Sequence, residues 1–496
     1  MTRRSDPRVS PPVGRSEQGH RTQSNGLRGN LGVLALVFTV VAYNGPLIGL
    51  GGVIPVVISA GNGLAAPTTF VSLGLLIALF AVGLNAMAVR MTHAGAFYTY
   101  VTAGLGRPLG LSAGFIALIA YVTLPAGIYA LLGSIAEHLL RNTFNISGGP
   151  PWWVWALTAW ATVTALSLFN IELSAKVIGI ASSLEVILVL IWNAVVVTNG
   201  GPSGRNVDIL SSYFSGSFAF ALIFGVLCLT GFESLQVFRS EVRDAYRTVP
   251  RATYISILVL TVLYAGSSYS YIIAFGPGAA LSAGATDPTG SVLNSISQYV
   301  SSTAGDLANV LLLSSSFAAC LSIQSVLARY IFALGRDRVL PAQLGVANPK
   351  HGSPMRAAAA GGALTLGAFA FPALSGSGPT LTFTSLNGTG AYCLLLLWLG
   401  TSLAVVAFFR SDRHGASIWA VLIAPIISAL GLALIAVLGT IHYNDIIGQA
   451  DHTLANSLLA LLLAVVVTAF VLALWFRTRR PDIYQRVGNQ SETVNT

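Results

Sequence analysis

The sequence predicts an all-α integral membrane protein with about twelve transmembrane helices, and three observations lead to that fold class. Hydrophobic residues make up 54% of the 496 residues and charged residues only 9%, whereas soluble domains carry roughly 25% charge. The apolar residues fall into runs of about 20, the length of helix that crosses about 30 Å of hydrocarbon. These runs lack the alternating pattern of barrel strands, and a bilayer offers no partners for free backbone groups, so helix is the expected structure.

The apolar runs divide the chain into a tail, a transport core, two further helices and a second tail. A polar, Arg-rich segment, 1–30, is expected to be a disordered cytoplasmic tail because it is too poor in apolar residues to fold alone. The core is predicted over 31–409, helices 11 and 12 over 416–476, and a cytoplasmic tail over 477–496. The twelve predicted spans are 31–58, 66–91, 108–133, 152–169, 174–198, 217–238, 253–275, 305–328, 357–376, 386–409, 416–440 and 455–476.

The basic residues predict the orientation of the chain in the membrane. All of the 26 Lys and Arg residues except Arg141 and Arg205 fall in segments on one side of the predicted spans. Since Lys and Arg accumulate in cytoplasmic loops, both termini are expected to be cytoplasmic, in a multi-pass protein of the plasma membrane. The net charge of +9 is then explained by topology and contact with lipid headgroups, and no nucleic-acid partner is expected.

Neither a cofactor nor a metal is expected. Cys228, Cys320 and Cys393 lie inside apolar runs without CxxC or Cys/His spacing, which favours packing over zinc binding. The sequence contains no HExxH, Walker or GxSxG motif beside a span, so an enzyme is not predicted. A receptor is not favoured either, since no loop is long enough for a folded soluble domain.

Two predicted spans contain helix-breaking residues near mid-membrane. Asn44, Gly45, Pro46, Leu47, Ile48 and Gly49 interrupt the first span, and Leu229, Thr230, Gly231 and Phe232 interrupt the sixth. A proline kink is the alternative for the first. A separation of five helices between the two breaks is what an inverted five-plus-five repeat produces, here over about 31–198 and 217–409. Free amides at such breaks suit a carboxylate and free carbonyls suit an ammonium group, so these ten residues are the predicted substrate site.

Three segments carry a resemblance to a known family. They are AGAFYTYVTAGLGRPLG (94–110), GFESLQVFRSEVRDAYRTVPRA (231–252) and ARYIFALGRDRVLPAQL (328–344) followed by HGSP (351–354). Together they resemble the amino acid, polyamine and organocation permeases, which implies twelve helices in a LeuT-like fold and transport of a small amine or amino acid. The chain departs from the family pattern at Ser240, at Ala245 and in the first break, which reads YNGPLIG instead of Gly-Ser-Gly.

Two glutamates are the candidate coupling residues. Glu185 lies near the centre of the fifth predicted span, where an acidic residue costs roughly 2.5 to 3.5 kcal/mol on insertion scales. Desolvation disfavours the charged form of a buried carboxyl group, so Glu185 could bind and release a proton; a structural hydrogen bond from helix five to helix one or eight is the equal alternative. The resemblance places Glu185 where several proton-coupled relatives carry a lysine. Glu233 follows the second break, where a structural hydrogen bond is favoured over contact with the ligand.

Ser314, Ser315 and Ser316 in the eighth span could supply hydroxyls to a cation, and packing is favoured for at least two of them. Sodium therefore competes with the proton as coupling ion. Of the aromatic residues Tyr43, Tyr121 and Phe232, only Phe232 is included in the predicted site. The sequence thus predicts a proton-coupled amino acid symporter working by alternating access, with a polyamine or amine permease or exchanger and a sodium symporter as alternatives.

Overall fold

The structure is a computed structural model that describes residues 32–91, 97–142, 149–168, 175–236, 242, 244–348, 353–413, 415–448 and 452–488. The predicted N-terminal tail, 1–30, and the last eight residues of the predicted C-terminal tail lie outside the described residues. Parts of the three family segments, at 94–96, 237–241, 243 and 351–352, also lie outside them.

The described chain is helical, with an isolated β-bridge between Gly201 and Gly204. The helices are α1 (Val33–Asn44), α2 (Pro46–Ile48), α3 (Ile54–Ala60), α4 (Ala66–Ala88), α5 (Phe97–Leu105), α6 (Arg107–Asn142), α7 (Trp152–Leu168), α8 (Ala175–Asn199), α9 (Phe218–Val226), α10 (Ala245–Phe275), α11 (Pro277–Thr286), α12 (Pro288–Tyr299), α13 (Ser302–Arg336), α14 (Met355–Leu374), α15 (Pro379–Phe408), α16 (Ala424–Ile441), α17 (Tyr443–Ile446), α18 (His452–Arg479) and α19 (Pro481–Arg486).

Ten helical segments of the described chain are long and apolar enough to cross a membrane. They coincide with ten of the twelve predicted spans, and the shorter apolar helices Trp152–Leu168 and Phe218–Leu229 coincide with the fourth and sixth. The all-helical class is confirmed, while the count of twelve and the repeat layout stay predictions. The sequence did not predict α5, α11, α12, α17 and α19, which are too short or too polar to register as spans.

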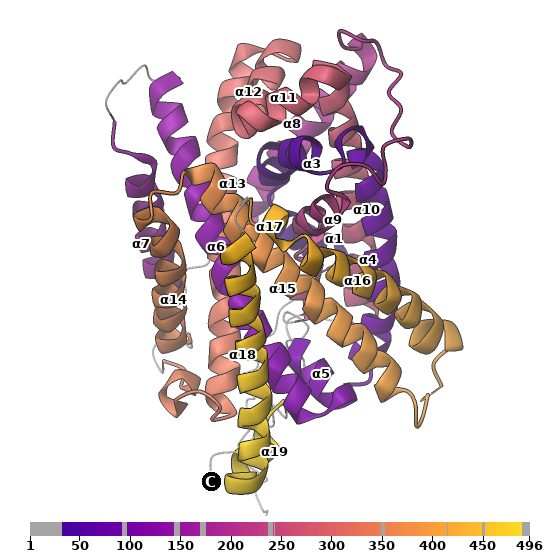
Figure 1. The fold of residues 1–496 in the computed structure, drawn as a ribbon, viewed down its shortest axis with the longest axis vertical. Helices are drawn as coiled ribbons and strands as arrows, with labels where there is room; N and C mark the ends of the chain where they lie inside the picture. The colour runs from indigo at the N-terminus through magenta and orange to yellow at the C-terminus, as the bar shows by residue number, and fades with distance from the viewer. Residues whose placement is uncertain are drawn as a thin grey trace, which may run out of the picture.

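The bundle has two distinct ends (Figure 1). Helices α11 and α12 cover one end, and α5 and α19 lie at the other, where the chain ends. In the middle, α1 packs against α8, α10 and α13. Large apolar side chains stay exposed on the outside of the bundle; Leu258 on α10, Leu434 on α16 and Leu461 on α18 are 63%, 58% and 60% exposed. Such a surface suits lipid rather than water.

The segment after α19 docks on the end of α13. Asp337 Oδ2 accepts hydrogen bonds from Gly488 N (3.0 Å) and from the Tyr98 hydroxyl (3.2 Å). Burial raises the pKa of the Asp337 carboxyl to about 6, even though these two hydrogen bonds and the charges of Arg336 and Arg486 lower it. Asp337 follows the last residue of the α13 span, so this cluster lies at the surface of the membrane region.

Candidate functional site

The first break lies between α1 and α2. Helix α1 ends at Asn44, Gly45 adopts a left-handed conformation (φ 64°), and Pro46 begins α2. A Cβ atom at Gly45 would lie 2.6 Å from Ile48 Cδ1 and 2.8 Å from Ser315 Oγ. Both the positive φ and the close approach of α13 therefore require glycine here.

A π-helical turn, Gly49–Val53, follows α2 and leads into α3. Tyr264 of α10 packs on the backbone of Gly49, where a Cβ atom would collide with its ring. The carbonyl of Gly51 accepts a hydrogen bond from the Thr289 hydroxyl of α12 (3.2 Å). Single π-turns inside helices cluster at functional sites because they free backbone groups.

The second break lies after Leu229. Thr230 is extended (ψ 173°), Gly231 has φ 97°, and a 3-10 turn resumes at Phe232. A Cβ atom at Gly231 would lie 2.6 Å from Tyr43 Cδ1. The backbone of the second break therefore packs on the side chain of Tyr43, which lies beside the first break. The structure therefore places a break at each of the two predicted positions and brings them side by side.

Asn44 joins the two breaks. Its Nδ2 donates to the carbonyl of Leu227 (3.0 Å) and, at 3.4 Å, to that of Thr230. Its Oδ1 accepts a hydrogen bond from the Tyr264 hydroxyl. The carbonyls of Leu227 and Thr230, which follow the end of α9, thus receive hydrogen bonds from the last residue of α1. Carbonyl groups at a helix end need such partners.

Glu185 of α8 reaches the first break and is 1% exposed. Its Oε2 accepts hydrogen bonds from Leu47 N (3.3 Å) and from the Ser315 hydroxyl (3.0 Å). One carboxyl group therefore joins α8, the first turn after the break, and α13. This is the hydrogen-bonded contact to helices one and eight that was the alternative to coupling in the sequence analysis, and the contact is compatible with both roles.

Glu233 is 5% exposed and folds back on the second break. Its Oε2 accepts from the amide of Gly231 (2.8 Å). Its Oε1 is buried, and no residue in the described ranges donates to it. The predicted structural hydrogen bond is present, and it leaves one carboxyl oxygen of Glu233 as a buried acceptor without a protein partner.

Three buried phenol side chains share this region with Glu233. Tyr43, Tyr121 and Tyr330 lie close enough to Glu233 for its charge to act on them. The rings of Tyr121 and Tyr330 are 5.1 Å apart. The Tyr43 hydroxyl is buried and forms no hydrogen bond within the described part of the chain. Two polar groups, Glu233 Oε1 and the Tyr43 hydroxyl, are thus available near the breaks.

The remaining residues of the predicted substrate site and the serines of α13 differ in their contacts. Phe232 is buried in an aromatic cluster with Phe80 and Trp398, at ring distances of 6.1 and 5.4 Å. The residues Pro46, Ile48 and Leu229 are buried and contribute backbone and apolar surface. Ser314 and Ser316 donate within their own helix, to Leu311 and Leu312, and packing for at least two of the three serines stays a prediction.

Tyr264 and Tyr330 contribute to the site although the sequence did not single them out. Both lie in long apolar helices, α10 and α13, where an isolated tyrosine looks like a packing residue. A signal that could have identified them is the pairing of a buried hydroxyl with a break that needs hydrogen-bond partners.

A profile of the family described as "Amino acid permease" matches residues 45–484, which include both glutamates and all of the two breaks except Asn44. The chain belongs to the amino acid permease family. The expected resemblance is thereby confirmed, and the chain is a multi-pass membrane transporter and not an enzyme.

Characterised permeases of bacteria are similar to the chain over most of its length. It is 26% identical to the low-affinity putrescine importer PlaP of Escherichia coli K12 over 340 residues, which cover 65% of this chain and 72% of PlaP. It is 25% identical to the branched-chain amino acid permease BcaP of Bacillus subtilis over 343 residues, 63% and 70% of the two chains. BcaP of Lactococcus lactis is 27% identical over 295 residues, 53% and 59%.

Proposed function

We propose that this permease carries an amino acid across the plasma membrane by proton-coupled symport, with Glu185 as the proton site and the two breaks as the substrate site. The observation that carries the proposal is the position of the Glu185 carboxyl, which accepts from both Leu47 N and the Ser315 hydroxyl. A proton bound there acts on the first break, on α8 and on α13 at the same time.

The coupling follows from the strength of these hydrogen bonds in the two protonation states. A carboxylate accepts hydrogen bonds roughly twice as strong as those of a neutral carboxyl group. Deprotonated Glu185 therefore holds the first break firmly against α8 and α13, and protonation loosens this contact. Proton binding thus favours the rearrangement of the first span relative to α8 and α13 that alternating access needs.

Sodium is the weaker candidate at this position. A sodium site is built from oxygen ligands that surround the ion. Here the amide of Leu47 points its N–H at Glu185, so a backbone donor takes the place that a further oxygen ligand would need. The Ser315 hydroxyl also donates to Glu185 in this arrangement. Both contacts favour a carboxyl group that exchanges a proton.

An amine permease is the second candidate, and Glu233 supports it. The buried Oε1 of Glu233 and the Tyr43 hydroxyl are acceptors for an ammonium group beside both breaks. The names of the relatives supply the two substrate classes: PlaP is a putrescine importer and BcaP a branched-chain amino acid permease. The partial positive charge of the half-helices that begin after the breaks favours the amino acid, since it presents a carboxylate as well as an ammonium group.

Uptake into proteoliposomes tests both parts. Labelled leucine and putrescine are offered with an inward proton gradient, an inward sodium gradient or no gradient, to the wild type and to Glu185→Gln. We expect the proton gradient to drive accumulation in the wild type. The variant, which is neutral at every pH, is expected to lose accumulation and keep exchange of internal for external substrate.

Three outcomes would change the proposal. Accumulation driven by sodium would assign the other coupling ion. A Glu185→Gln protein that accumulates substrate like the wild type would remove Glu185 as proton site. Uptake of putrescine and not leucine would decide for the amine permease.

A further inference from the structure

Tyr264 spans the turn that follows the first break. This residue of α10 is fully buried, its ring packs on the backbone of Gly49, and its hydroxyl donates to Asn44 Oδ1. Between these two contacts lies one hydrogen-bonded turn, in which the amide of Gly49 donates to the carbonyl of Gly45 (3.1 Å). Tyr264 therefore contacts the chain both before and after the turn that carries Leu47.

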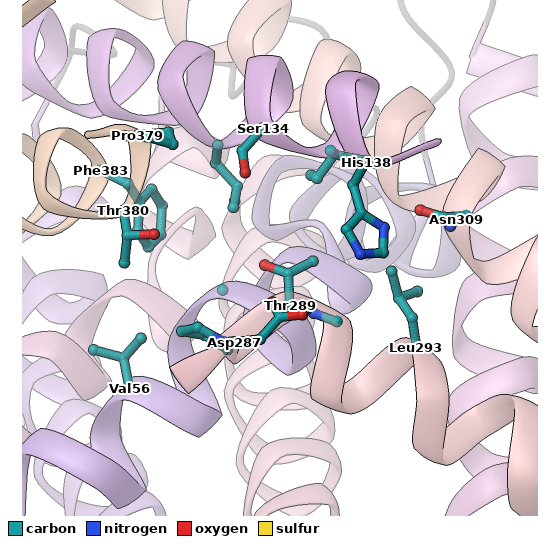
Figure 2. A pocket seen from close by; sticks show the side chains of 15 residues that line it. Val56, Ser134, His138, Asp287, Thr289, Leu293, Asn309, Pro379, Thr380 and Phe383 are labelled. Carbon is teal, nitrogen blue, oxygen red and sulfur yellow. Dashed lines mark hydrogen bonds between the residues drawn. The ribbon is translucent and has the colours of Figure 1, made fainter. Parts of the chain in front are cut away.

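The far end of this segment is fixed by α12. The Thr289 hydroxyl donates to the carbonyl of Gly51 (3.2 Å), and Thr289 lies among the residues that line a cavity of about 50 Å³ (Figure 2). A cavity of this volume has room for a few water molecules and none for an amino acid, so a substrate does not shift the chain there. A displacement that starts at Leu47 is therefore expected to travel toward Asn44 rather than toward α3.

Glu185 sets the position of the turn. Its Oε2 accepts a hydrogen bond from Leu47 N (3.3 Å), and Tyr264 lies close enough for the charge of Glu185 to act on it. A carboxylate accepts hydrogen bonds roughly twice as strong as those of a neutral carboxyl group, so protonation weakens the hold on Leu47. The turn can then shift under the ring of Tyr264, and the hydroxyl of that ring is bonded to Asn44.

Asn44 occupies the carbonyls of the second break. Its Nδ2 donates to the carbonyls of Leu227 (3.0 Å) and Thr230 (3.4 Å). A side-chain amide offers two N–H donors and an ammonium ion three. The amide of Asn44 therefore takes the place that the ammonium group of a substrate would take, and these carbonyls become acceptors for a ligand only when Asn44 withdraws.

We propose that Asn44 and Tyr264 are positioning residues that transmit the protonation of Glu185 to the second break. With Glu185 deprotonated, Tyr264 holds Asn44 on the two carbonyls and blocks them. With Glu185 protonated, the turn shifts, the Asn44 amide leaves, and the carbonyls accept the ammonium group. Proton and substrate then favour each other's binding, as coupling between two sites requires. This inference rests on the proposed function, because it takes Glu185 as the proton site.

Equilibrium binding to the purified full chain in detergent, measured at pH 5 and pH 7.5, tests the proposal. The probes are labelled leucine and labelled putrescine, whose ammonium groups stay charged at both pH values. Tyr264→Phe removes the hydroxyl and keeps the ring, and Asn44→Ala removes the amide. Tyr271→Phe is the matched control, because Tyr271 lies in the same helix, is buried, and shares a hydrogen bond with Ser291 (2.9 Å).

Glu185→Gln separates the proton site from the other titratable groups. Tyr264 lies near Glu185 and Cys228, and tyrosine and cysteine ordinarily ionise above this pH range. Glu233 at the second break is a further carboxyl group, so the pH dependence of binding that remains in Glu185→Gln is the background for the other variants.

We expect the wild type to bind substrate more tightly at pH 5 than at pH 7.5, by about 5- to 150-fold, the usual range of coupling between two sites. Tyr264→Phe should reduce this ratio by about fivefold, the effect of one hydrogen bond. Asn44→Ala should reduce the ratio to the background by raising the affinity at pH 7.5 toward the value at pH 5. Tyr271→Phe should keep the wild-type ratio.

A purely structural role of the pair would weaken binding at both pH values and leave their ratio unchanged, and that result would overturn the inference. Wild-type affinities in Tyr264→Phe and Asn44→Ala would overturn it as well. Gel filtration verifies that each variant is folded, and either variant alone decides the question. In these outcomes the proposed function stands, provided that Glu185→Gln loses the pH dependence.

The proposed function fails in a different way. A wild type that binds neither probe, that binds equally at both pH values, or that shares its full pH dependence with Glu185→Gln would overturn the proposed function and the inference together.

Discussion

The two breaks satisfy their backbone groups in different ways. At the first break, the amide of Leu47 is bound by Glu185, which is 138 residues away in the sequence, and α10 and α13 close on the glycines. At the second break, the amide of Gly231 is bound by Glu233, two residues away, and the carbonyl of Gly231 by Ser234. The first break is therefore held by distant helices, whereas the second is closed mainly by its own residues.

This difference assigns different tasks to the two acidic residues. Glu185 uses its Oε2 to connect three elements, so a change in its protonation alters how those elements are joined. Glu233 needs only Oε2 for the local turn and keeps Oε1 as an acceptor. We infer that the first break responds to the coupling ion and the second break holds the ligand.

The largest effect is expected from a methyl group at the second break. Gly231→Ala places a Cβ atom 2.6 Å from Tyr43 at φ 97°, where an L-residue costs about 1–2 kcal/mol even without a clash. Uptake should be lost and thermal stability in detergent lowered. The matched change Gly266→Ala lies in α10 with nothing within 4 Å and should retain uptake, since alanine favours a helix by roughly 0.5–1 kcal/mol. Normal uptake by Gly231→Ala would show that the second break tolerates an ordinary side chain.

The next effect separates binding from coupling. Glu233→Gln should weaken binding of the ammonium substrate by about 10- to 100-fold, as expected for a lost charge on a buried acceptor, and leave the accumulation ratio at saturating substrate close to that of the wild type. Glu185→Gln should show the reverse pattern. Equilibrium binding and gradient-driven uptake measure the two quantities. If both variants lose affinity and coupling together, the two breaks do not have separate tasks.

A smaller effect is expected from removing the Ser315 hydroxyl of α13, which donates to Glu185. Ser315→Ala removes one of its two donors and should slow gradient-driven uptake by a few-fold, consistent with about 1 kcal/mol for one hydrogen bond. Ser314→Ala removes a hydroxyl that bonds only within its helix and serves as the control. Equal rates for the two variants would mean that Glu185 acts through Leu47 alone.

The smallest effect is expected at a buried carboxyl away from both breaks. Because the pKa of Asp337 is raised from 3.8 to about 6 in the folded protein, the folded state binds more protons than the unfolded state between those values. The stability that this group contributes therefore falls as the pH rises from about 4 to about 6 and is constant above. Asp337→Asn should raise the melting temperature at pH 7 by on the order of 1–2 °C and leave coupling unchanged.

Thermal unfolding of wild type and Asp337→Asn at pH 5 and pH 7 measures this effect. The gain should shrink toward pH 5, where the wild-type carboxyl is largely protonated. A coupling defect in Asp337→Asn as large as that of Glu185→Gln would show that loss of any buried carboxyl impairs transport, and the contrast between the breaks would lose its meaning.

The breaks could be predicted from sequence because their cause is local. Gly45–Pro46 and Thr230–Gly231 stop a helix whatever surrounds them, and the length of the apolar runs reveals the membrane class. The helices α11 and α12 were missed because both are shorter than a membrane span.

The partners of the breaks could not be predicted, since they depend on which face of a distant helix turns inward. Ser314, Ser315 and Ser316 are identical in type and successive residues point about 100° apart around a helix. Only the packing of α13 decides that the middle one meets Glu185. The same holds for Tyr264, whose hydroxyl meets Asn44 from α10.

The π-helical turn Gly49–Val53 has a consequence for the length of the chain. Such a turn holds one residue more than an α-helical turn, and each residue of an α-helix advances by about 100°. The wider turn therefore absorbs its extra residue, and deleting a single residue here would restore regular helix with the first break and α3 on nearly the same faces. Glu185 would still face the first break. Among homologous transporters, a one-residue gap at this point is thus compatible with an unchanged orientation of the substrate site.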